Sequence, residues 1–213
     1  MDRRRYLLFE DHVKEYDSWY IEHAKVFECE ARALEALDLR GFGLDVGVGT
    51  GVFACRVGVS VGVDPSLSML RIVKARGVEV VSAVGEHIPF REDAFDYILL
   101  VNTLCFLDSP RIVIKESVRV LKKNGSLILC EVPKDSSWGS FYEREGRRGH
   151  KFYSQACFYT SAEIRHLLES EHLSIVKVKA TLSYGPLEKE KIEDPKDDAE
   201  GLGFVCFQAV RSR

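Results

Sequence analysis

A glycine-rich turn at residues 43–51 constrains this chain more than any other part of its sequence. It reads Gly-Leu-Asp-Val-Gly-Val-Gly-Thr-Gly, so a short apolar strand runs into three glycines at alternate positions. Because glycine has no Cβ atom, the backbone here can take left-handed dihedral angles and a ligand can approach the main chain closely. A helix after the turn would direct its amide-rich N-terminus to the same place. Val52 stands where a dinucleotide fingerprint needs its last glycine, which argues against NAD or FAD.

A second apolar strand ends in a carboxylate, Asp64, which is followed by Pro65. A doubly wound sheet places an acidic side chain at this point to accept hydrogen bonds from the hydroxyls of a ribose. A simpler interpretation is that Asp64 caps a helix and that the glycines form only a tight turn. The two features together, in register, favour a nucleotide-like ligand.

Five ordered motifs resemble those of the S-adenosylmethionine-dependent methyltransferases of the Rossmann-like class I family. The family pattern acidic-x-Gly-x-Gly-x-Gly matches residues 45–51, and its acid at the end of the second strand matches Asp64. Residues 85–90, 94–98 and 119–125 are similar to three later blocks of the family, in the same order. The likeness is closest to the small-molecule methyltransferases of ubiquinone and menaquinone biosynthesis.

The resemblance implies S-adenosylmethionine as cofactor and S-adenosylhomocysteine as product. The family often binds adenine with an acid where this chain has Val84, so we expect backbone groups near residues 85–86 to take that role. Asn102 is a further candidate because it follows the fourth strand, where open sheets bind ligands. The full set of predicted cofactor residues is Asp45, Gly47, Val48, Gly49, Thr50, Gly51, Asp64, Pro65, Gly85, Glu86, Asn102, Tyr16 and Tyr20.

Each of these candidates has an alternative interpretation. Asn102 is also a favourable turn residue. Glu86 could be an exposed carboxylate, and aromatic residues of the N-terminal helices could simply pack in the core.

An aromatic segment at residues 132–160 is a candidate lid over the substrate. The predicted substrate contacts are Trp19, Tyr142, His150, Tyr153 and Tyr159. We assign no catalytic residue, because Cys105 and Phe106 stand where many relatives carry a His-His pair. The basic stretch 144–151 either clamps an anionic acceptor or is a solvated surface segment.

Hydrophobic patterning predicts an α/β fold in which strands alternate with helices. We expect strands near 43–46, 59–63, 78–82, 95–101, 126–131, 173–180 and 204–210. Helices are expected at 52–57, 67–76 and 109–122, and a capping box at 160–163 opens another that ends near 170. The resemblance implies a doubly wound, mostly parallel seven-stranded sheet of order 3-2-1-4-5-7-6, with the last strand antiparallel.

The chain length favours one domain, 1–213, with four parts. These are N-terminal cap helices (1–40), a cofactor-binding core (41–131), a lid insertion (132–160) and a C-terminal helix with a closing hairpin (161–213). Residues 9–37 have the spacing of two helices that pack across the cofactor mouth. The acidic and basic segment 184–203 is expected to be a solvated, mobile loop.

Composition limits the classes of ligand and partner that this chain is expected to bind. A formal charge of −3 gives no general attraction for nucleic acid or anionic membranes. The six cysteines form no Cys-x-x-Cys pair, so we expect no metal and expect buried thiols in a reducing cytoplasm. No apolar stretch is long enough to span a membrane, and the run at residues 6–9 is too short for a signal peptide. The chain has only two asparagines and two glutamines, which is typical of proteins from thermophiles.

We therefore expect a methyltransferase that acts on a small-molecule acceptor by in-line displacement. Two alternatives remain: a non-catalytic cofactor-binding member of the fold, and a methyltransferase that acts on protein or RNA. The sequence gives no indication of the oligomeric state.

Overall fold

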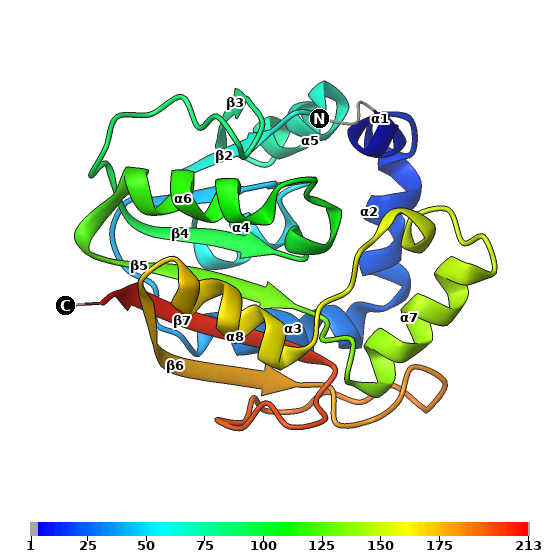
Figure 1. The fold of residues 1–213 in the computed structure, drawn as a ribbon. Coiled ribbons are helices and arrows are strands. Elements are labelled where there is room, and N and C mark those ends of the chain that lie inside the picture. The colour runs from blue at the N-terminus through cyan, green and yellow to red at the C-terminus, as the bar shows by residue number, and fades with distance from the viewer. Residues whose placement is uncertain (1–3, 213) are drawn as a thin grey trace.

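One seven-stranded sheet forms the centre of the molecule, with the strand order β3-β2-β1-β4-β5-β7-β6 (Figure 1). The computed structural model describes residues 4–212, so residues 1–3 and 213 of the predicted domain lie outside it. The strands are β1 (Gly43–Val46), β2 (Val61–Asp64), β3 (Glu79–Ser82), β4 (Phe95–Val101), β5 (Leu121–Glu131), β6 (Leu173–Thr181) and β7 (Phe204–Arg211). Pairing is parallel from β3 to β5, and β7 is antiparallel to both of its neighbours. The predicted fold is confirmed.

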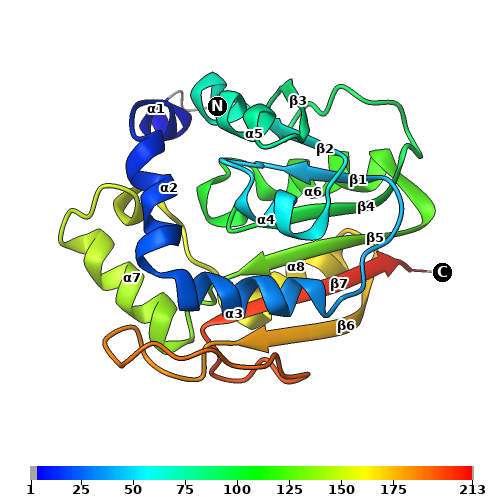
Figure 2. The ribbon, with the colours of Figure 1, turned by 180° about the vertical axis from the view of Figure 1, so that it is seen from behind.

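Helices cover both faces of this sheet. They are α1 (Arg4–Asp11), α2 (Val13–Glu22), α3 (Ala24–Glu35), α4 (Val52–Val57), α5 (Leu67–Ala75), α6 (Pro110–Val120), α7 (Ser137–Arg147) and α8 (Ser161–Ser170). Two short 3-10 helices are η1 (Leu104–Phe106) and η2 (Tyr153–Gln155). Helices α6 and α8 lie in front of the sheet in Figure 1, and α3 and α4 cover the opposite face in Figure 2.

The central strands are buried on both faces, as parallel strands between helices must be. Alternate residues of β1 point to opposite sides, so Leu44 and Val46 pack in the cluster under α6 and α8. Val26 and Leu34 of α3 belong to the cluster on the other face, together with Phe53 of α4. The carboxyl ends of the parallel strands point toward α1, α2 and α7, at the right of Figure 1.

Three N-terminal helices are present where the spacing predicted two. The chain breaks at His12 and again at His23, and neither side chain caps the helix that follows. Glu10 at the end of α1 accepts hydrogen bonds from Ser66 Oγ (2.6 Å), Ser68 N (3.0 Å) and Ser68 Oγ (2.7 Å) at the start of α5. Helices α1 and α2 therefore lie at the carboxyl end of the sheet and are held there by side chains.

The segment after β5 contains a helix that its sequence did not reveal. Helix α7 begins after Ser136, whose hydroxyl accepts a hydrogen bond from Gly139 N at 3.0 Å. Gly139 and Gly146 lower helix propensity, which hid this helix. A Cβ on Gly139 would collide with Pro133 O, and one on Gly146 would lie 2.6 Å from Tyr153 O. The glycines are thus explained by close approach of neighbouring main chain.

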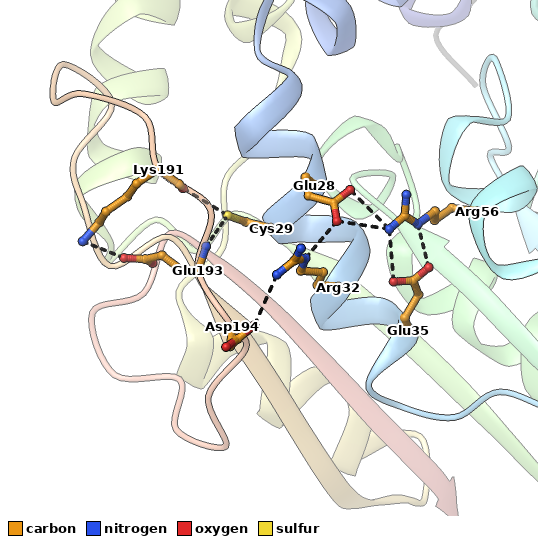
Figure 3. A network of polar contacts seen from close by, with 8 residues as sticks. All are labelled: Glu28, Cys29, Arg32, Glu35, Arg56, Lys191, Glu193 and Asp194. Carbon is orange, nitrogen blue, oxygen red and sulfur yellow. Dashed lines mark hydrogen bonds and ion pairs between the residues drawn. The ribbon is translucent and has the colours of Figure 1, made fainter.

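The loop between β6 and β7 is fastened to α3 rather than free in solvent (Figure 3). Cys29 Sγ accepts from Glu193 N at 3.2 Å and donates to Lys191 O at 3.4 Å. Arg32 pairs with Asp194 at 3.3 Å and also with Glu28 on its own helix, at 2.8 Å. Most of residues 184–203 are exposed, as predicted, but these contacts also fasten the loop to α3; its mobility stays a prediction.

The cysteines differ from the expected set of buried thiols. Cys130 of β5 and Cys206 of β7 lie opposite each other in the antiparallel register and form a disulfide. Cys55 and Cys157 are exposed. Within the described residues, no helix is both long and apolar enough to cross a membrane.

Candidate functional site

The glycine turn joins β1 to α4 and is fixed against the end of β2. The amides of Gly47 and Val48 both donate to the carbonyl of Val63, at 2.8 and 3.0 Å. Gly47, Gly49 and Gly51 have φ values of 78°, 54° and 78°. These are left-handed conformations that residues with a Cβ adopt only with strain, so the predicted left-handed backbone at the alternate glycines is confirmed.

Asp64 connects this turn to the start of α5. Its Oδ2 accepts from Gly49 N at 3.0 Å and its Oδ1 accepts from Ser66 N at 2.8 Å. Ser66, not Asp64, is the N-cap of α5, since its hydroxyl accepts from Met69 N. The Asp64 side chain is only 9% exposed, and burial raises its pKa to about 6 although the two amides oppose that shift. Asp64 is thus a nearly buried acceptor held in a fixed orientation.

A cavity opens beside Asp64 at the carboxyl ends of β1, β2 and β4; we call it the strand-end cavity. Eight of the predicted cofactor residues line it: Tyr16, Gly47, Gly49, Asp64, Pro65, Gly85, Glu86 and Asn102. Asn102 has a φ of 51°, so it also serves as the turn residue that the alternative interpretation proposed. Side chains of α1 complete the wall, and the sequence did not single out Tyr6 or Phe9.

Five predicted cofactor residues do not line the strand-end cavity: Asp45, Val48, Thr50, Gly51 and Tyr20. Asp45 is buried, and its Oδ1 has no hydrogen-bond partner among the described residues. Burial, with a contribution from the charge of Asp64, raises the pKa of Asp45 to about 8. Val48 packs against Gly62, where a Cβ would lie 2.7 Å from its methyl groups.

A second cavity of about 530 Å³ lies between α2, α3 and α7; we call it the aromatic cavity. Its aromatic lining consists of Phe9, Tyr16, Trp19, Tyr20, Phe106, Tyr142, His150, Phe152, Tyr153 and Phe158. The rings of Tyr142 and Tyr153 stack with centroids 4.2 Å apart, and His150 stacks on the other side of Tyr153 at 4.1 Å. Four residues line both cavities: Phe9, Tyr16, Asn102 and Phe106.

The structure brings together four of the five predicted substrate contacts in this cavity, namely Trp19, Tyr142, His150 and Tyr153. Tyr159 lines neither cavity and packs against the core cluster under α6 and α8. Tyr20, which was grouped with the cofactor residues, lines the aromatic cavity instead.

Two buried glutamates in the aromatic cavity were missed from the sequence. Glu30 of α3 is 2% exposed, and Glu131 at the end of β5 is 3% exposed. The sequence does indicate that Glu30 is buried, because this residue falls on the apolar stripe of its helix, four residues after Val26 and four before Leu34. A charged residue at such a position is unusual without a partner.

The basic stretch 144–151 does not form a free cationic surface. Arg147 pairs with Glu143 at 2.9 Å, and Arg148 pairs with Glu145 at 3.0 Å. Lys151 reaches Glu15 of α2 at 2.5 Å, which ties the segment after α7 to α2. Among residues 4–212, no cluster of His, Cys, Asp or Glu has the arrangement of a metal site.

Comparison with known structures decides the family. A crystal structure of a SAM-dependent methyltransferase from Thermotoga maritima, described as a "possible histamine N-methyltransferase", matches this fold with a TM-score of 0.93. The two chains are 34% identical, and the match covers 98% of this chain and 100% of that one. This chain belongs to the S-adenosylmethionine-dependent methyltransferases.

Other relatives of this methyltransferase are similar over different lengths. A protein of Methanocaldococcus jannaschii with no characterised function is 35% identical over 204 residues, covering 96% of this chain and 98% of that protein. A family model described as a methyltransferase domain matches residues 44–129. The demethylmenaquinone methyltransferase of Corynebacterium kroppenstedtii is 33% identical over 92 residues only, covering 41% of this chain.

The strand-end cavity fits the cofactor of this family. Its wall combines a buried acceptor, Asp64, with a glycine turn whose main chain borders the open space. A Cβ on Gly49 would point at the ring of Tyr16, 3.6 Å away across the cavity wall. A ligand with a ribose and an extended polar tail could therefore contact both the acid and the backbone.

Proposed function

We propose that this methyltransferase binds S-adenosylmethionine in the strand-end cavity and methylates a small molecule held in the aromatic cavity. The observation that carries the proposal is the wall of four residues that both cavities share. A shared wall lets two ligands approach each other closely, as a direct transfer requires.

The assignment of roles follows from the position of each group around the strand-end cavity. Asp64 would accept hydrogen bonds from both ribose hydroxyls, with its carboxylate held by Gly49 N and Ser66 N. The turn at Gly47 and Gly49 would lie against the methionyl part, and Gly85 and Glu86 would border the adenine. When bound, S-adenosylmethionine supplies a methyl group on a positively charged sulfur: the acceptor's lone pair bonds to the methyl carbon, and the carbon–sulfur pair remains on sulfur.

The protein's own contribution is to position the acceptor and exclude water. Phe9 of α1 contacts Phe106, with ring centroids 4.9 Å apart, and stacks on Phe152 at 5.5 Å. The hydroxyls of Tyr16 and Tyr20 form a hydrogen bond of 2.9 Å beside this cluster. These contacts place an apolar cover over the junction of the cavities, which supports catalysis by proximity and orientation.

The size and surroundings of the aromatic cavity favour a small acceptor over a macromolecule. A volume of about 530 Å³ is in the range of small-molecule sites. Arg147 of α7 and Arg148, which follows the helix, could attract RNA, but both are paired with glutamates. The description of the Thermotoga relative also names a small molecule, which supports the same class of acceptor.

Calorimetric titration with S-adenosylmethionine, S-adenosylhomocysteine and NAD, in parallel, tests the cofactor assignment. We expect both adenosyl compounds to bind and NAD not to bind; NAD binding would contradict our interpretation of the glycine turn. Incubation with mixtures of small metabolites, followed by mass spectrometry for products heavier by one methylene, tests turnover. Cofactor binding with no methylated product from any mixture would favour a non-catalytic, cofactor-binding protein.

A further inference from the structure

The charge of the aromatic cavity is one-sided. Four glutamates line it: Glu15, Glu22, Glu30 and Glu131. No lysine or arginine is among the described residues of its lining, and His150 is the single basic residue there. Glu15 is paired with Lys151 beside the cavity, so the other three glutamates give the lining its negative character. Because carboxylates repel one another and an anionic ligand alike, this lining selects against acids and phosphates as acceptors.

Glu30 is the most unusual of the four. Its Oε2 has no hydrogen-bond partner among the described residues, although the side chain is 98% buried. A buried carboxyl without a partner destabilises a folded protein, and burial here raises the pKa of Glu30 to about 8. A group that is costly for the fold and borders a cavity is a candidate for ligand recognition.

The position of Glu30 is fixed by the opposite face of its helix. Figure 3 shows that Glu28 and Arg32 of α3 belong to a network with Arg56 and with the loop between β6 and β7. This network holds the outer face of α3, so the helix cannot readily turn Glu30 toward solvent. The carboxyl of Glu30, with its unpartnered Oε2, therefore stays at the cavity wall.

Glu131 occupies a different part of the same cavity. Its Oε1 accepts from Leu104 N at 2.6 Å, within the segment 102–106 whose residues Asn102 and Phe106 border both cavities. Burial raises its pKa to about 7, although hydrogen bonds from the same segment oppose the shift. Glu131 is thus the carboxyl attached to the wall between the cavities, and Glu30 lies on a separate element, α3.

Aromatic faces accompany these carboxylates. The stacked rings of Tyr142, Tyr153 and His150 line the cavity, and so do the rings of Trp19, Tyr16 and Tyr20. Organic ammonium ions are bound by ring faces together with carboxylates, through cation–π contacts and charge-assisted hydrogen bonds. An ammonium ion would give Glu30 both an N–H donor and a compensating charge, whereas a neutral acceptor would give it at most a hydrogen bond.

We propose that the methyl acceptor of this enzyme is a small organic amine that binds as its ammonium ion, with Glu30 as the counter-charge. The inference rests on the proposed function, since it concerns the second substrate of the same transfer. Before it can react, the nitrogen must give up one proton to free its lone pair, and that N–H proton passes to one of the carboxylates that line the cavity, Glu30 or Glu131. The freed pair then forms the bond from nitrogen to the methyl carbon, as the bond from that carbon to sulfur breaks.

Binding of matched ligands tests the amine assignment. A panel of small amines is titrated by calorimetry with S-adenosylhomocysteine at saturation, each beside the alcohol and the carboxylate of the same skeleton; the first set is 2-phenylethylamine, 2-phenylethanol and 3-phenylpropanoate. We expect at least one amine to bind about 10-fold or more tighter than its alcohol, and its carboxylate not to bind. Glu30→Gln should remove this preference for the amine while leaving the affinity for the alcohol and for S-adenosylhomocysteine unchanged.

Glu169→Gln is the control, because it removes an exposed carboxylate, on α8, that lies outside both cavities and outside the network of Figure 3. It should leave the preference for the amine intact. Binding of no amine in the panel, equal binding of amine and alcohol, or an unchanged preference in Glu30→Gln would overturn the proposal. Failure of S-adenosylhomocysteine itself to bind would instead count against the proposed function, so the two failures are distinguishable.

Discussion

The two cavities of this enzyme meet at one wall but are built in different ways. The strand-end cavity includes a glycine turn and other local motifs that follow β1 and β2, and its acid, Asp64, is held by two backbone amides. The aromatic cavity is formed by side chains from distant segments, and its acid, Glu30, has an oxygen without a partner. A ligand common to a whole family can be bound by backbone, whereas an acceptor that differs between members depends on side chains.

The largest expected effect tests whether main chain forms the first cavity. Gly49→Leu should abolish detectable binding of S-adenosylhomocysteine, because its side chain would enter the space between the turn and Tyr16. Calorimetry gives the affinity, and circular dichroism shows whether the fold is kept. Gly58→Leu is the control: Gly58 also has a positive φ, 69°, but a Cβ on it would meet no atom within 4 Å. Normal binding by Gly49→Leu would show that the turn is only structural.

Asp64→Ala should weaken binding of S-adenosylhomocysteine by about 100-fold, or about 3 kcal/mol, through loss of charge-assisted hydrogen bonds. It would also leave Gly49 N and Ser66 N without their acceptor. Asp64→Asn keeps an oxygen for one of them and should lose less. Asp96→Asn, at the start of β4 and far along the sheet from the cavity, should bind normally. Unchanged affinity in Asp64→Ala would refute the ribose assignment.

A third experiment measures how much the buried Glu30 of the aromatic cavity lowers the free energy of unfolding. The folded protein keeps a proton on Glu30 up to a pKa of about 8, whereas the unfolded chain releases it near the ordinary glutamate pKa of 4.5. The folded state thus binds more protons between these values, so this group lowers the free energy of unfolding as pH rises, by up to about 1.4 kcal/mol per pH unit. Glu30→Gln should be more stable than wild type at pH 8, with a smaller difference near pH 5.

Urea unfolding at several pH values measures that difference. Asp45 and Glu131 also have raised pKa values, so only the change between variant and wild type is informative. Glu28→Gln serves as control, because ion pairs with arginines lower the pKa of Glu28 and its contribution is constant above pH 5. Parallel curves for wild type and Glu30→Gln would show that Glu30 is ionised or solvated in the folded protein.

The smallest effect concerns the helix that covers both cavities. Glu10→Gln removes the charge that joins α1 to Ser66 and Ser68, so S-adenosylhomocysteine should dissociate a few-fold faster while the fold is kept. Stopped-flow displacement measures the rate. Asp11→Asn, an exposed neighbour on the same helix, should dissociate like wild type. Equal rates in all three proteins would show that these contacts do not hold the cofactor.

Local signals predicted most of the fold. The capping box at Thr160 and Glu163 placed the start of α8, and both of its reciprocal hydrogen bonds are present. The apolar runs placed every strand, but β5 begins at Leu121 rather than 126. Its first residue, Leu121, pairs with Phe95 of β4, and residues 122–125 fall in a register shift before pairing resumes at Ser126. Apolar periodicity cannot detect such an irregular start. Helix α7 was missed because its glycines lower helix propensity, and the reason for them is close contact with main chain outside the helix.

The two cavities also differ in how much of each could be predicted from local sequence. The residues of the strand-end cavity come from contiguous motifs, so Gly47, Gly49 and Asp64 could be chosen from spacing and resemblance. The aromatic cavity joins α2 and α3 to β5 and α7, and only the fold brings Glu30 near Tyr142 and Tyr153. A sequence shows that Glu30 interrupts an apolar stripe, but not which cavity that stripe borders.

The absence of cationic lining has a consequence for the order of product release. No lysine or arginine is among the described residues that line either cavity, whereas carboxylates line both. These walls attract a cofactor whose sulfur is positively charged more strongly than the same molecule after that charge is gone. Methyl transfer therefore weakens the hold on the spent cofactor, while a methylated ammonium ion remains attracted to Glu30, so S-adenosylhomocysteine should depart first.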